Sequence, residues 1–272
     1  MELCMFSKKL QELSFEELGR ALKELGFDGV DLTVRAGGHI EPEAVGDRLP
    51  EAKEILAAQD INISMITTAI REIGEPYAKD VLETAGSLGV GYFKLRPYRY
   101  EGFGTLKQSI AEVQAKLKGL EPVCRESGIR LGIQTHSQNY LGASIPHILR
   151  MIEDSDPEWV GVYYDIGHAA VEGGHAAWRM NLDDVSERLF MVAIKDMKLV
   201  RREAADVKYS SWRGEVVPFG EGFVDWKGFT DCLKQIGFDG PCSLHSEYDL
   251  PTQEVIEQTR KDLAFLRPLL EG

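Results

Sequence analysis

The stretch 26-GFDGVDLTV-34 joins a helical pattern to a strand pattern, and this junction decides the type of fold. Before it, Leu18, Leu22 and Leu25 recur at helical spacing, which predicts an amphipathic helix. A glycine just past a helix is typical of a C-cap, and the second glycine relaxes the turn into the strand. The same tetrapeptide recurs at 237–240, so both copies predict a loop that leads from a helix into a strand.

Outward from this junction, short apolar or β-branched runs alternate with amphipathic stretches along the whole chain. The expected strands are 2–6, 29–35, 61–67, 91–96, 129–136, 160–165, 190–196 and 241–247. The expected helices are 15–25, 43–58, 77–88, 106–127, 144–152, 183–189, 226–236 and 252–270. Eight strand–helix units predict a parallel sheet, and eight is the number of strands that closes into a barrel.

No stretch is rich enough in Pro, Gly or Ser to be a linker between domains. We therefore expect an α/β protein with a single domain over residues 1–272, a (β/α)8 TIM barrel in which 241–247 pairs beside 2–6. The longer strand-to-helix loops are expected after the second, fourth, sixth and especially the seventh strand, where 197–222 forms the loop. Active sites of such barrels lie on the side of these loops.

The composition limits the partners that the protein can have. A net charge of −13 argues against nucleic-acid binding, which calls for clustered Lys and Arg. No apolar run approaches the roughly 18 residues of a membrane span, and the first residues lack the apolar core of a signal peptide. Four cysteines without a C-x-x-C pair favour reduced thiols. We therefore expect a cytoplasmic protein with no membrane partner, and a homo-oligomer is compatible with the sequence.

Polar residues occupy the inner side of the expected strands near their carboxyl ends. Because side chains alternate along a strand, the apolar members of each strand fix which positions face inward. The inward set is Asp31, Thr33, Arg35, Lys94, Arg96, Gln134, His136, Tyr163, Asp165, Lys195, Ser243, His245 and Glu247. A purely structural barrel would carry Val, Ile and Leu there. The pattern predicts a binding site at the mouth of the barrel, although Asp165 alone could be a helix N-cap and a single inward charge could belong to a core ion pair.

The chain resembles the sugar phosphate isomerase/epimerase superfamily, the xylose-isomerase-like β/α barrels, over essentially its whole length. The motifs that carry the resemblance are GFDGVD at 26–31, YDIGH at 164–168, IKD at 194–196, FGEG at 219–222, VDW at 224–226 and the final GFDGPCSLHSE at 237–247. The resemblance implies a small-molecule sugar substrate and chemistry that moves a proton beside a sugar carbonyl.

The resemblance also implies one divalent metal ion as cofactor, Mn, Zn, Mg or Co. The metal positions of the family fall at Gln134, Asp165, Ala193 and His245, with Glu247 as a second candidate on the last strand. A glutamine offers only a neutral oxygen and cannot abstract a proton, and an alanine offers no ligand. A metal site is thus expected from Gln134, Asp165, His245 and Glu247 with waters. Alternatively, Lys195 takes the place of the metal beside an enolate oxygen, or it only pairs with Asp165 or Glu247.

These residues predict an isomerase or epimerase that acts through an enediolate or enolate. The expected catalytic residues are His245, Glu247, Lys195 and His168. The expected substrate-binding residues are Arg35, His39, Arg96, His136, His168 and Arg213. Two alternatives stay open. One is elimination beside a ketone, as in relatives that cleave 3-keto-glycosides, for which a single base suffices. The other is a sugar-binding barrel that has lost catalysis.

Overall fold

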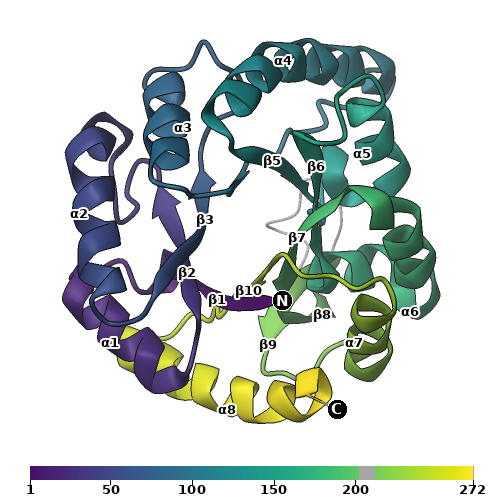
Figure 1. The fold of residues 1–272 in the computed structure, drawn as a ribbon. Coiled ribbons are helices and arrows are strands. Elements are labelled where there is room, and N and C mark those ends of the chain that lie inside the picture. Colours follow the sequence, from purple (N-terminus) through teal and green to yellow (C-terminus); the bar gives the residue numbers. More distant parts are fainter. Residues whose placement is uncertain (202–211, 272) are drawn as a thin grey trace.

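The computed structural model describes residues 1–201 and 212–271. Eight parallel strands form a closed barrel in the order β1-β10-β7-β6-β5-β4-β3-β2, and helices surround it (Figure 1). The barrel strands are β1 (Glu2–Phe6), β2 (Gly29–Val34), β3 (Asn62–Thr68), β4 (Tyr92–Lys94), β5 (Arg130–Gln134), β6 (Val160–Asp165), β7 (Leu189–Ile194) and β10 (Pro241–Leu244). The α-helices are α1 (Phe15–Leu25), α2 (Val45–Ala57), α3 (Ala78–Ser87), α4 (Leu106–Ser127), α5 (Ile145–Ile152), α6 (Ile166–Val185), α7 (Trp226–Gln235) and α8 (Thr252–Glu271).

The barrel closes where the sequence predicted that it would. β10 pairs in parallel with β1, and Cys4 lies opposite Ser243 in the register. The structure therefore confirms the single-domain (β/α)8 TIM barrel. Among the described helices, none combines the length and the apolar character that a membrane span requires.

The helix-to-strand junction forms as its residues dictate. Ser14 and Glu17 form a capping box at the start of α1, and Gly26 ends the helix in the left-handed conformation with φ of 78°. Gly237, the first glycine of the second copy of the motif, also has positive φ. Only a residue without Cβ adopts this conformation at little cost, which explains the glycine in both motifs.

Two separate apolar layers result from the alternation along the strands. Val30, Leu32 and the other outward residues pack against the helices in the large core. Inside the barrel, Met65, Tyr163, Met191 and Ala193 form a small cluster of their own. This inner cluster lies beneath the polar residues at the mouth of the barrel.

The segment after β6 differs from the expected loop. α6 begins at Ile166, directly after the strand, and continues to Val185, so the helix expected over 183–189 overlaps only its last three residues. Gly174, with φ of 63° and ψ of −173°, joins two helical pieces across a kink. The pair Gly173-Gly174 suggested a loop in the sequence because glycine is unfavourable inside a helix, whereas here it provides the kink.

The segment after β7 also contains more structure than expected. β8 (Asp196–Arg201) and β9 (Trp212–Val217) pair as an antiparallel two-stranded sheet outside the barrel. The expected loop over 197–222 was therefore wrong where these strands lie, and its part from 202 to 211 lies outside the described residues.

Candidate active site at the carboxyl end of the barrel

A cavity of about 570 Å³ lies at the carboxyl ends of the barrel strands. This volume is in the range typical of small-molecule sites. Its lining includes ten polar or charged side chains of interest, namely Lys8, Arg35, Lys94, Arg96, Gln134, His136, His168, Lys195, His245 and Glu247. Most of the inward residues predicted from strand alternation are therefore gathered around one cavity.

Lys195 occupies the centre of the polar network. Its ammonium nitrogen lies 3.0 Å from Oδ2 of Asp165 and 3.0 Å from Oε2 of Glu247, and only 3% of its side chain is exposed. Burial alone would lower the pKa of Lys195, but the two carboxylates outweigh it and raise the pKa above its ordinary value. Lys195 is therefore a permanently charged cation at the base of the cavity.

Both oxygens of Asp165 are already engaged. Oδ2 accepts a hydrogen bond from the side-chain amide nitrogen of Gln134 at 2.8 Å, and Oδ1 accepts from the backbone N–H of His168 at 3.2 Å, which makes Asp165 the N-cap of α6. Burial would raise the pKa of Asp165, but Lys195 and then His168 and His245 lower it to about 2. Asp165 thus serves as a fixed negative charge and an N-cap at once.

Glu247 is held in a similar way between two cations. Lys8 donates to Oε1 at 2.6 Å, and Lys195 donates to Oε2 at 3.0 Å. Burial would raise the pKa of Glu247, but Lys195 and the neighbouring donors hold it well below its usual range. Its weak basicity makes it poorly suited to abstract a proton.

His245 has one ring nitrogen engaged in a hydrogen bond and one buried beside Glu247. Nε2 lies 2.8 Å from the hydroxyl of Tyr163, which in turn donates to Asp31 at 3.4 Å. The hydroxyl of Tyr163 donates its single proton to Asp31. It therefore accepts a hydrogen bond from Nε2 of His245. Nδ1 is buried without a hydrogen-bond partner among the described residues and lies 3.5 Å from Oε2 of Glu247. The hydrogen bond to Tyr163 therefore leaves Nδ1 as the ring nitrogen without a hydrogen bond, beside the carboxylate of Glu247.

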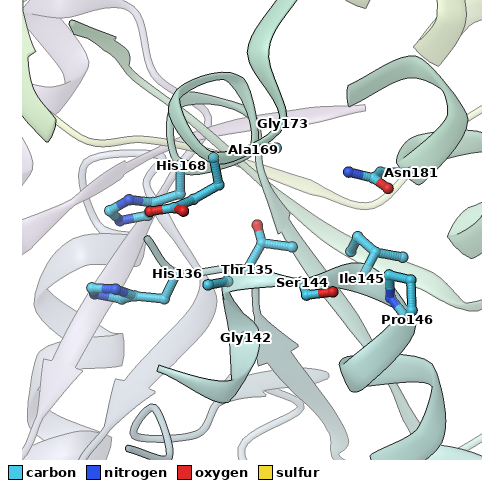
Figure 2. A pocket seen from close by; sticks show the side chains of 12 residues that line it. Thr135, His136, Gly142, Ser144, Ile145, Pro146, His168, Ala169, Gly173 and Asn181 are labelled. Atoms are coloured by element: carbon cyan, nitrogen blue, oxygen red, sulfur yellow. The ribbon is translucent and has the colours of Figure 1, made fainter. Parts of the chain in front are cut away.

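His136 and His168 form a stacked pair at the edge of the cavity. Their ring centroids are 4.3 Å apart, and Ser137 holds Nδ1 of His168 through its hydroxyl at 2.7 Å. Burial lowers the pKa of His136 to about 4 and that of His168 well below its usual value, so both rings are neutral. Figure 2 shows the two rings one above the other beside a second cavity of about 240 Å³, whose lining they share. The stacked pair thus separates the two cavities.

Two of the predicted substrate-binding residues lie elsewhere. His39 does not line the cavity. Its Nδ1 lies 3.3 Å from the hydroxyl of Thr33, and its ring stacks against Phe15. Arg213 lies in β9, 3.9 Å from Glu215. His39 lies in the segment after β2, and Arg213 lies in a two-stranded sheet outside the barrel, so the alternation of the barrel strands gives no direction for either side chain.

Three residues near the cavity were not among the predicted site residues. Lys94 faces inward by the alternation that placed its neighbours, so the sequence contained its signal. Lys8 follows β1 in a short 3-10 helix, where strand alternation predicts no direction for a side chain. Asp196 is fully buried, and its carboxylate accepts from the backbone N–H groups of 197, 220, 222 and 224 and from the indole of Trp226. It fixes the segment after β9 against the end of β7.

The fold is that of the xylose isomerase-like TIM barrels. The model of that family matches residues 20–269, and the chain belongs to the family. The matched span includes β2 to β10. It also includes Lys195, its partners Asp165 and Glu247, and Gln134, but not Lys8.

Curated relatives match only part of their own length. An uncharacterised protein of Methanocaldococcus jannaschii is 22% identical over 192 residues, which are 69% of this chain and 61% of the relative. Inosose dehydratase of Geobacillus kaustophilus is 29% identical over 132 residues, 47% of this chain and 42% of the relative. The match thus spans less than two thirds of either relative.

Solved structures match the whole fold at low identity. D-psicose 3-epimerase of Clostridium cellulolyticum, solved with D-tagatose, aligns with a TM-score of 0.76 at 13% identity and covers 100% of both chains. 3-Keto-D-glucoside 4-epimerase of E. coli aligns with a TM-score of 0.73 at 18% identity, covering 98% of this chain and 99% of that one. The IOLI protein, solved with a bound zinc atom, aligns with a TM-score of 0.75 at 18% identity over 100% of both chains. At these identities the likeness shows the fold.

The side chains of this site do not fit the divalent ion that the family implies. The ammonium of Lys195 lies between the carboxylates of Asp165 and Glu247, which are the two anionic donors of the expected metal set. Gln134 turns its amide nitrogen, which is no metal ligand, toward Asp165. Within residues 1–201 and 212–271, no group of three His, Cys, Asp or Glu side chains is arranged to hold a metal.

Proposed function

We propose that the protein enolises a carbonyl-bearing sugar, with His245 as the base and the ammonium of Lys195 as the group that stabilises the enolate oxygen. The observation that carries this proposal is that a buried cation and an imidazole with one nitrogen free of hydrogen bonds line the same cavity. Proton abstraction beside a carbonyl needs these two elements, a base and a positive group at the developing oxyanion.

The choice of base follows from the hydrogen bonds of the alternatives. Asp165 and Glu247 each have both carboxylate oxygens engaged. Burial raises their pKa values, but the attraction of Lys195 outweighs it, so both pKa values are lowered. Nδ1 of His245 is the nitrogen left free by the Tyr163 hydrogen bond. Tyr163 and Asp31 act as positioning residues because they hold the ring and its proton.

In the proposed reaction, Lys195 supplies the positive charge that a divalent ion would supply in a metal-dependent enzyme. The expected cofactor from Gln134, Asp165, His245 and Glu247 stays a prediction that the donor geometry disfavours, and the proposed reaction does not depend on it. A buried ammonium that is held in place by two carboxylates needs little reorganisation when a neighbouring oxygen becomes negative.

A single free base favours elimination over epimerisation as the finer reaction. Epimerisation through one base on each face of a sugar calls for a second free base, whereas elimination needs one. In the elimination, His245 takes the proton beside the carbonyl and the electrons form the enolate. The enolate then expels the β-hydroxyl, which takes up the proton from His245 and leaves as water. The name of the Geobacillus kaustophilus relative, inosose dehydratase, supports this direction.

Hydrogen–deuterium exchange separates enolisation from its later steps. We would incubate the protein in D₂O with an inosose, a 3-keto-glucoside and D-tagatose and follow the C–H beside each carbonyl by NMR. We expect exchange with at least one of these sugars, and loss of water where a β-hydroxyl is present. His245→Gln should reduce the exchange rate about 100-fold or more.

The matched control is His147→Gln, because His147 lies on α5 and lines neither cavity. Thermal unfolding of each variant shows whether it folds, and Lys195→Met serves as a second active-site variant. Exchange by His245→Gln at the wild-type rate would contradict the assignment of the base. The absence of exchange with every sugar in the wild type would contradict the proposed function.

A further inference from the structure

One side of the cavity carries three cations that have no ion-pair partner among the described residues. Lys94 lies buried in β4, Arg35 is half-buried just after β2, and Arg96 is exposed two residues beyond Lys94. All three line the cavity. None of their side chains forms a hydrogen bond or ion pair with another side chain in the described parts of the chain, and the guanidinium of Arg35 lies 5.8 Å above the ring of Phe6.

The other two lysines of the cavity show the contrast. Lys8 is neutralised by Glu247, and Lys195 is neutralised by Asp165 and Glu247. These carboxylates are therefore already matched by positive charge. The three remaining cations give their side of the cavity a net positive charge, in a protein whose total charge is −13.

Burial without a counter-charge is unfavourable for a cation. Burial, followed by repulsion from Arg35, lowers the pKa of Lys94 to about 8, even though Asp31 and Glu247 act in the opposite direction. Burial also lowers the pKa of Arg35. A site that keeps such charges free in a cavity is suited to a ligand that brings the missing negative charge.

We propose that the substrate carries an oxyanion group, a phosphate or a carboxylate, which Arg35, Lys94 and Arg96 bind together. The two guanidinium groups can each donate two parallel hydrogen bonds to such a group, and Lys94 contributes a point charge from the wall of the barrel. The inference rests on the proposed function, because it assigns the other end of the same substrate. The sugar carbonyl lies toward Lys195 and His245, and the oxyanion lies toward β2 and β4.

Calorimetric titration of the full chain tests the binding of the oxyanion without any turnover. The probes are inorganic phosphate, D-glucose 6-phosphate and D-glucuronate, with D-glucose as the neutral counterpart. We expect at least one charged sugar to bind about tenfold or more tightly than D-glucose. Tighter binding of the phosphorylated sugar together with inorganic phosphate assigns a phosphate, and tighter binding of D-glucuronate alone assigns a carboxylate.

Arg96→Gln and Arg35→Gln should each weaken this binding about tenfold or more. The matched control is Arg99→Gln, three residues further along the same segment, because Arg99 lies over Tyr140 and outside the cavity lining. Thermal unfolding identifies any variant that does not fold, and the exposed position of Arg96 makes its variant the main test.

The outcomes of this test and of the exchange experiment are distinct. Equal affinity for charged and neutral sugars, or equal losses in Arg96→Gln and Arg99→Gln, would overturn the oxyanion site. If neutral sugars alone are enolised and Arg35→Gln and Arg96→Gln retain full rates, the oxyanion site is wrong and the proposed function stands. If the charged sugars bind through Arg35 and Arg96 but no sugar exchanges its proton, the site stands and the enolising function is wrong.

Discussion

The ammonium of Lys195 and the carboxylate of Asp165 form an ion pair at 3.0 Å, with 3% and 0% of the two side chains exposed. Removing one member of a buried pair leaves the other without compensation and costs about 3–5 kcal/mol. The carboxylate cannot be solvated at this depth, so the pair behaves as one unit in stability as well as in the electrostatics of the site.

Lys195→Met should therefore lower both the melting temperature and the rate of proton exchange, the latter by about 100-fold or more. Lys195→Met combined with Asp165→Asn should recover much of the lost stability, since no uncompensated charge of this pair remains, but not the activity. Calorimetric melting and the exchange assay measure the two effects separately. Full recovery of the exchange rate in the double variant would show that Lys195 has only a structural role.

Chelation should leave the reaction unchanged. Because Lys195 lies between the anionic donors, prolonged treatment with EDTA followed by desalting should not reduce the exchange rate. Titration of the wild type with Mn²⁺ and Zn²⁺ should give weak binding. Gln134→Glu combined with Lys195→Met should bind these ions more tightly, since a charged oxygen replaces a neutral one and the competing ammonium is removed. A wild type that is inactivated by EDTA and reactivated by one metal would contradict the lysine-based site.

Lys94 should make the protein more stable as the pH rises above 8. Its pKa is about 8 in the folded protein and 10.5 ordinarily, so between these values the unfolded chain binds more protons. The free-energy cost of the buried charge on Lys94 has its full value below pH 8 and disappears toward pH 10.5. The groups that face Lys94 are Arg35, Lys195, Asp31 and Glu247.

Lys94→Met should accordingly stabilise the protein at pH 7, by about 1–3 kcal/mol, and the gain should shrink between pH 8 and 10.5. Denaturant unfolding at pH 7, 9 and 10 measures it. Lys107→Met, at an exposed position of α4, is the control and should show no such trend. A constant difference between Lys94→Met and wild type at all three pH values would contradict a lowered pKa of Lys94.

Asp196→Ala should loosen the segment after β9. Its carboxylate accepts hydrogen bonds from four backbone N–H groups and one indole, and a buried donor left without a partner costs about 1–3 kcal/mol. We expect a marked loss of stability and faster amide exchange at Gly220, Gly222 and Val224. Asp225→Ala, which removes the exposed N-cap of α7, should cost only about 1 kcal/mol and leave those amides protected.

Strand alternation predicted the parts of the site at and just beyond the carboxyl ends of the barrel strands. Asp165, Lys195, His245 and Glu247 were expected to share a pocket, and the structure brings them within ion-pair distance of one another. The alternation works because each strand packs its apolar face against helices, which leaves no choice for the inner face. His39 lies in the segment after β2, and Arg213 lies in β9 outside the barrel, so neither packs between the barrel interior and the helices.

The eightfold repeat predicted the barrel, but not the elements added to it. β8 is buried only at Asp196 and Met197 and β9 only at Val217, and their other residues are exposed or half-buried, so their apolar signal is weak. α6 was missed because two adjacent glycines interrupt it, and helix propensity penalises glycine whether or not a kink is useful. The orientation of Gln134 toward Asp165 rests on a hydrogen bond between side chains of two different strands, which no local pattern encodes.

The contrast between the acidic exterior and the basic cavity wall has a kinetic consequence. An anion that approaches from solution first meets the repulsive field of a protein with a charge of −13 and then the attraction of Arg96 at the rim. Salt screens the long-range repulsion more strongly than the short-range attraction, because the Debye length is about 8 Å at physiological ionic strength. Moderate salt should therefore increase the association rate of a charged sugar while it lowers the affinity of the site for that sugar. Arrival and retention would then have opposite dependences on ionic strength.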